Sequence, residues 1–112
     1  MTELEVNIGV KEAAELLNDN DVVFLDCRTE KERQFANFND KSLFIPIDEI
    51  GKRSAELDGF RDQQIVVYCH SGGRSAMVVE WLRGNGFSKA QNMVGGIDQW
   101  SVEIDANVPR YQ

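Results

Sequence analysis

The chain has 112 residues, 42% of them hydrophobic, and carries a formal net charge of -7 with two cysteines and one histidine. This size predicts one compact domain over residues 1–112, and the negative charge argues against binding to nucleic acid or to an anionic membrane surface. No apolar run is long enough to span a bilayer and the first residues are unlike a signal peptide, so we expect a cytoplasmic protein.

Predicted helices and strands alternate along the chain. In order they are a helix over 10–18, a strand over 21–26, a short helix over 28–34, a strand over 43–45, a helix over 47–57, a strand over 65–68, a helix over 74–83, a strand over 90–94 and a helix over 97–102. The strands over 21–26 and 65–68 are continuous apolar runs, as in strands buried on both faces. In the helix over 74–83, one apolar face is expected to comprise Met77, Val78, Trp81 and Leu82. The alternation predicts an α/β fold with a mainly parallel sheet that helices cover on both faces.

One apolar run leads straight into a polar loop that begins with Cys69 and ends near Arg74. Where a buried strand feeds a helix N-terminus, free backbone N–H groups and the helix dipole favour negative charge. We therefore expect Cys69 to be a thiolate at neutral pH and to act as a nucleophile. Gly72 and Gly73 allow the tight curl that such a loop needs.

Four further residues near the two strand ends are candidates for the site. Arg74 is a cation at a helix start, where it opposes the helix dipole, so we expect it to bind substrate or to stabilise the loop. His70 is expected on the rim of the site, where it would help to attract an anionic donor. Asp26 and Arg28 follow the other buried strand, and we expect them to support the site as an ion pair that braces adjacent loops.

The second cysteine, Cys27, also ends a buried run and is expected to be a small core residue. Two other roles stay open: a resolving thiol that attacks an oxidised Cys69, and a transient Cys27–Cys69 disulfide. Cys27, Cys69 and His70 lack the spacing of metal-ligand pairs, so we expect no metal site and no cofactor.

Several segments, in this order and at these spacings, resemble the rhodanese (sulfurtransferase) family over nearly the whole chain. They are residues 10–17, Leu25-Asp26-Cys27-Arg28 with Glu32, Phe44-Ile45-Pro46, residues 66–75, Gly86-Phe87 and residues 95–100. Within the family, residues 37–39, 43–45 and 108–111 are similar to the rhodanese domain joined to enzymes that activate sulfur carriers in molybdopterin and thiamine synthesis. The chain departs from the usual pattern at Cys27, Arg33 and residues 36–38.

The resemblance implies the rhodanese fold, with a central five-stranded sheet, and Cys69 as the catalytic residue. Cys69 would take a sulfane sulfur from thiosulfate or a persulfide donor, become a persulfide, and pass the sulfur to cyanide, a dithiol or a sulfur-carrier protein. The substrate-binding residues that the resemblance implies form the loop itself: His70, Ser71, Gly72, Gly73, Arg74 and Ser75.

Loop length separates the reaction classes within this resemblance. The residues between Cys69 and Arg74 match the sulfurtransferase loop, whereas related phosphatases and arsenate reductases have a loop one residue longer. A small phosphatase is therefore disfavoured. The remaining alternative is an interaction or sulfur-relay module that acts on one protein partner with little turnover of small donors. A monomer is the default expectation.

Overall fold

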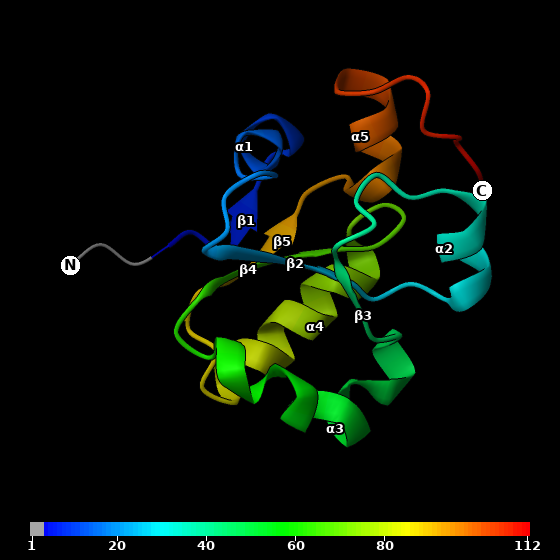
Figure 1. Cartoon of the computed structure of the whole chain (residues 1–112). Helices are drawn as coiled ribbons and strands as arrows, with labels where there is room; N and C mark the ends of the chain where they lie inside the picture. The colour runs from blue at the N-terminus through cyan, green and yellow to red at the C-terminus, as the bar shows by residue number, and fades with distance from the viewer. Residues whose placement is uncertain (1–3) are drawn as a thin grey trace.

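The computed structural model describes residues 4–112, which form a five-stranded parallel sheet with helices on both faces (Figure 1). The strand order is β1-β5-β4-β2-β3, and every neighbouring pair is parallel. These findings confirm the predicted α/β class and the five-stranded sheet. Its strands are β1 (Asn7–Ile8), β2 (Val22–Asp26), β3 (Leu43–Phe44), β4 (Gln64–Tyr68) and β5 (Ala90–Met93). The sequence pattern did not locate β1, because a strand of two residues carries no periodicity.

In Figure 1, α1 and α5 lie on one side of the sheet and α3 and α4 on the other, while α2 follows the carboxyl end of β2. The helices are α1 (Val10–Glu15), α2 (Glu30–Phe35), α3 (Ile50–Arg53), α4 (Gly73–Gly84) and α5 (Gly96–Glu103). Within residues 4–112, no helix is both long and apolar enough to cross a membrane.

The central strand β4 separates two hydrophobic cores. Ile65 and Val67 pack into the core under α4, whereas Val66 and Tyr68 pack into the core under α1 and α5. This alternation is the two-residue period of a strand. Cys69 continues the series and belongs to the core on the α4 side, so its sulfur points toward the beginning of α4.

The prediction of one helix over 47–57 is wrong. The segment is divided into a 3-10 turn (Ile47–Glu49), the short α3 and a second 3-10 stretch (Ser54–Phe60). Only Ile50 and Leu57 are buried in it, which leaves no continuous apolar stripe to dock a regular helix. Gly51 further lowers the helix propensity.

The apolar face predicted for the helix over 74–83 is only half right. Val78 and Leu82 are buried, but Met77 is 64% exposed and Trp81 37% exposed. The buried face instead includes Val79 and begins at Ser75, whose hydroxyl faces the Cys69 sulfur. The spacing 75, 78, 79, 82 is one helical stripe, so the contact with Cys69 sets which side of α4 is buried.

Candidate active site

The Cys69 sulfur lies where the loop after β4 folds back into α4. The backbone N–H groups of Gly72 and Ser75 donate to Sγ, with N···S distances of 3.1 Å and 3.4 Å. The Ser75 hydroxyl oxygen is 3.3 Å from the same sulfur. Cys69 is only 1% exposed, so these groups act with little competition from water. Three polar groups thus converge on one sulfur atom.

This arrangement favours the thiolate. Burial opposes ionisation of the Cys69 thiol, but hydrogen bonds from Ser75 and from the amides of Gly72 and Ser71 outweigh it, so the pKa of Cys69 lies below its ordinary value. The N-terminus of α4 adds positive potential at the same place. The thiolate is the form that attacks sulfur electrophiles.

The loop takes its shape from glycines and from the start of α5. Gly72 has φ +107°, a left-handed conformation that side chains other than glycine rarely adopt. The N–H groups of Ile97 and Asp98, in the first turn of α5, donate to the carbonyls of Cys69 and His70 at 2.9 Å and 3.0 Å. Gly96 makes this close approach possible, because a Cβ there would lie 2.5 Å from both carbonyl oxygens.

The predicted loop residues lie in different environments. Gly72 and Ser75 are buried beside the sulfur, whereas Ser71 and Gly73 are exposed. The structure therefore brings backbone groups and the Ser75 hydroxyl to Cys69, while the Ser71 side chain remains at the surface.

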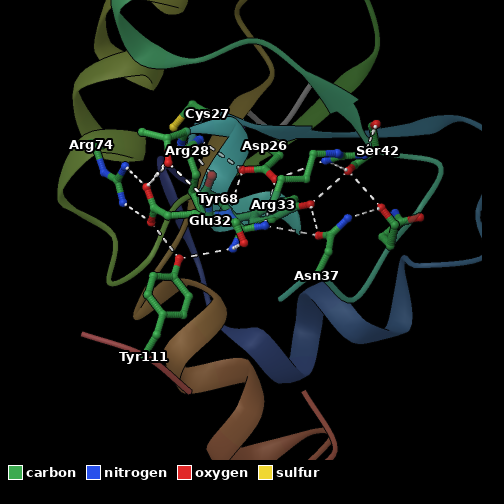
Figure 2. Close-up of polar contacts among 12 residues, drawn as sticks. Asp26, Cys27, Arg28, Glu32, Arg33, Asn37, Ser42, Tyr68, Arg74 and Tyr111 are labelled. Atoms are coloured by element: carbon green, nitrogen blue, oxygen red, sulfur yellow. Dashed lines mark hydrogen bonds and ion pairs between the residues drawn. The ribbon is translucent and has the colours of Figure 1, made fainter. Parts of the chain in front are cut away.

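Arg74 does not point freely into the site. Its Nη1 and Nη2 donate to Glu32 Oε1 and Oε2 at 2.6 Å and 2.8 Å, a two-point ion pair between α4 and α2 (Figure 2). The Arg74 guanidinium holds the pKa of Glu32 well below its usual range. Of the two roles expected for Arg74, this geometry favours stabilisation of the loop.

Tyr111 adds a third contact to Glu32. Its hydroxyl donates to Glu32 Oε2 at 2.7 Å and accepts from Arg28 Nη1 at 3.1 Å (Figure 2). The Tyr111 ring stacks on His70 with ring centroids 4.2 Å apart. His70 is thus partly covered instead of standing free on the rim, and its Nε2 lies 4.0 Å from Asp98 Oδ1.

The ion pair predicted for Asp26 and Arg28 is present. Arg28 Nε and Nη2 donate to Asp26 Oδ1 and Oδ2 at 2.9 Å and 2.8 Å, and both side chains are fully buried. Arg33 also donates to Asp26 Oδ2 at 3.0 Å (Figure 2). A buried carboxylate with two guanidinium partners is well compensated, and it braces the end of β2 beside the loop.

Cys27 and Cys69 occupy neighbouring places at the ends of two paired strands. Asp26 of β2 pairs with Tyr68 of β4. Cys27 directly follows Asp26, and Cys69 directly follows Tyr68. Both thiols are free and belong to the same core. Burial, with the nearby Cys69 sulfur, raises the pKa of Cys27 far above its ordinary value. Cys27 is therefore a poor nucleophile in this environment.

Three polar residues of the site were not predicted as functional: Glu32, Tyr111 and Asn92. Glu32 and Tyr111 appeared only as parts of segments that resemble the rhodanese family. Asn92 lies in β5, is 6% exposed and accepts a hydrogen bond from Ser75 Oγ at 2.5 Å. A buried amide in the middle of a predicted strand is a signal that sequence reasoning could have used.

An open pocket of about 760 Å³ lies beside the loop. Lys31 and Phe35 of α2 form one wall, and His70, Arg74 and Tyr111 form another. Phe35 is 57% exposed and contacts the Tyr111 ring edge-on, with ring centroids 5.8 Å apart. The pocket thus places an apolar surface next to the polar residues of the loop.

Comparison with known proteins identifies the class. The family model of the rhodanese-like domain matches residues 9–103, and the chain belongs to this family of sulfurtransferase-type domains. A rhodanese-related protein from Thermoplasma volcanium is 30% identical and superposes with a TM-score of 0.77, covering 94% of this chain and 96% of that one.

In two other relatives, the region that matches this chain is one part of a larger protein. A NAD-dependent persulfide reductase from A. fulgidus is 34% identical with a TM-score of 0.63, over 81% of this chain and 15% of that one. A tRNA uridine(34) hydroxylase from Citrobacter koseri is 33% identical over 90 residues, which are 77% of this chain and 25% of the relative. The chain thus spans about a quarter of the length of the curated relatives that it matches.

Proposed function

We propose that this domain transfers sulfane sulfur through a persulfide on Cys69. The observation that carries the proposal is the convergence of the Gly72 and Ser75 amides and the Ser75 hydroxyl on one buried sulfur. These groups stabilise a thiolate before the reaction and an anionic persulfide after it. The short loop that carries these groups suits one sulfur atom better than a tetrahedral phosphate.

The reaction has two steps. The Cys69 thiolate attacks the outer sulfur of thiosulfate; the S–S bond of the donor breaks and sulfite leaves with the electron pair. An acceptor, either cyanide or a thiolate, then attacks the terminal sulfur of the persulfide. The bond to Sγ breaks, the acceptor leaves as thiocyanate or as a new persulfide, and the Cys69 thiolate is restored.

The curated relatives include proteins named for tRNA hydroxylation. The net charge of -7 opposes contact with a phosphate backbone, so we propose sulfur chemistry and not RNA binding for this chain. A sulfur-carrier protein remains one acceptor to test, together with small dithiols.

A specific observation favours a second candidate, delivery of sulfur to a protein partner. Cys69 is 1% exposed, whereas the pocket beside the loop has an exposed aromatic wall at Phe35. A partner that covers Phe35 would bring its own thiol to the loop. Under this alternative, thiosulfate turnover is slow and a protein persulfide donor or acceptor is fast.

The test is the intact mass of the reduced protein after brief exposure to thiosulfate, and separately to a small alkyl persulfide. Wild type is expected to gain one sulfur atom that cyanide removes. Cys69→Ser should gain none, and Cys27→Ser, the matched control, should behave as wild type. An adduct on Cys69→Ser, or no adduct with either donor, would refute the proposal. Labelling by the persulfide alone would exclude thiosulfate as the donor and leave the Cys69 persulfide mechanism standing.

A further inference from the structure

A chain of side-chain hydrogen bonds runs from the Cys69 sulfur through the sheet to its edge. Ser75 Oγ lies 3.3 Å from Cys69 Sγ and 2.5 Å from Asn92 Oδ1. Asn92 Nδ2 in turn donates to Asn7 Oδ1 at 3.3 Å. Cys69, Ser75 and Asn92 are buried, whereas Asn7, on the edge strand β1, is exposed. The buried amide therefore depends on Ser75 and Asn7 for its side-chain hydrogen bonds.

The Ser75 hydroxyl has one proton and two neighbouring acceptors. When Cys69 is a thiol, its S–H can donate to Ser75 Oγ, and the Ser75 proton then goes to Asn92 Oδ1. When Cys69 is a thiolate, the sulfur has no proton to donate and becomes the stronger acceptor. Asn92 Oδ1 and the sulfur thus compete for the same proton.

A carboxamide can accommodate both states without a change of shape. Turned over, Asn92 presents Nδ2 to Ser75 Oγ and Oδ1 to Asn7, so the whole chain of hydrogen bonds reverses and Ser75 donates to the thiolate. An exposed Asn7 amide can turn freely to match. A carboxylate in place of Asn92 could only accept, and would retain the Ser75 proton.

We propose that Asn92 is a positioning residue: by turning its amide, it directs the Ser75 hydroxyl toward the Cys69 sulfur when that sulfur loses its proton. This deepens the proposed sulfur transfer and rests on it for its role in turnover. Arg74 of α4 and Cys27 after β2 also interact electrostatically with Cys69. The substitutions below leave both in place.

The test is the pH dependence of Cys69 alkylation by iodoacetamide, with the modified residue identified by peptide mapping. Asn92→Asp is expected to raise the midpoint of alkylation by about one pH unit, which lowers the thiolate fraction about tenfold at pH values below the wild-type midpoint. Gln91→Glu is the matched control. Gln91 is a buried amide next along β5 whose side chain bonds to Gln64 and the Glu5 carbonyl, away from the loop. The Gln91→Glu substitution should leave the midpoint of Cys69 alkylation unchanged.

A carboxylate could also act on the thiolate directly through its charge, and the Ser75→Ala background separates the two routes. If Ser75 transmits the effect, Asn92→Asp should shift the midpoint by less than half as much in Ser75→Ala as in wild type. An equal shift in both backgrounds would overturn the proposal.

Asn92→Leu keeps the test decisive even if Asn92→Asp does not fold. It removes the amide oxygen that competes with the sulfur for the Ser75 proton, so the alkylation midpoint should fall below the wild-type value; an unchanged midpoint or a rise would overturn the proposal. Alkylation needs no sulfur donor, so failure here leaves persulfide formation untouched. Conversely, failure of the thiosulfate test leaves the alkylation result standing.

Discussion

Glu32 binds Arg74 through two parallel hydrogen bonds of 2.6 Å and 2.8 Å, and so ties α2 to the first turn of the helix that follows the cysteine loop. The two residues are far apart in sequence, and neither contacts the Cys69 sulfur directly. The pair leaves Arg74 little freedom to reach a substrate. Under the proposed function, the loop amides and the α4 N-terminus would recognise the anionic sulfur donor.

Glu32→Gln is expected to lower the free energy of unfolding by about 2 kcal/mol at neutral pH, because it removes a charged acceptor from Arg74 and Tyr111. The folded pKa of Glu32 lies well below its ordinary 4.5, so its contribution is complete above about pH 4.5 and is lost as pH falls toward the folded value. Urea unfolding should show the stability gap between wild type and variant narrowing steadily as pH falls below about 4.5.

Tyr111→Phe provides a graded comparison. It keeps the stacking on His70 but removes the hydroxyl, so a smaller loss, about 1 kcal/mol, is expected in the same direction. Glu30→Gln, on the exposed side of the same helix, is the control and should be neutral. A pH-independent gap between wild type and Glu32→Gln would contradict the ion-pair account.

Only one of the two cysteines should react in the folded protein. Burial raises the pKa of Cys27, whereas hydrogen bonds lower that of Cys69, so iodoacetamide is expected to modify Cys69 alone at neutral pH. Cys27→Val should retain persulfide formation, because valine fills a similar volume in the core. Peptide mapping before and after urea denaturation provides the measurement. Native labelling of Cys27 at a comparable rate, or loss of the persulfide in Cys27→Val, would instead support a resolving role.

Two glycines near the loop should respond in opposite ways to alanine. Gly96→Ala would place a methyl group 2.5 Å from the carbonyls of Cys69 and His70 at φ +60°, so a loss of about 3 kcal/mol is expected. Gly73→Ala meets no atom within 4 Å and lies in α4, so it should be neutral or slightly stabilising. The measurement is the urea unfolding midpoint of each variant, compared with that of wild type. Equal midpoints for the two variants would show that α5 does not hold the loop as described.

Local sequence patterns were enough to predict the α/β class, the two buried strands and the place of Cys69 between a strand end and a helix start. These follow from local patterns: continuous apolar runs, a helical period and a glycine-rich turn, each readable within about ten residues. The Asp26–Arg28 pair was also predictable, because its two members are close in sequence and follow the same strand.

The groups from distant segments that meet around the sulfur could not be predicted from the sequence. Glu32, Tyr111 and Asn92 come from α2, the C-terminal segment and β5, and their contacts depend on strand order and helix docking, which no local period encodes. The same reason explains why the apolar face of α4 was predicted only in part. The contact of Ser75 with Cys69 sets which side of the helix faces the core, and helix propensity carries no information about that side. Local patterns thus place the nucleophile, and the packing of remote segments sets its environment.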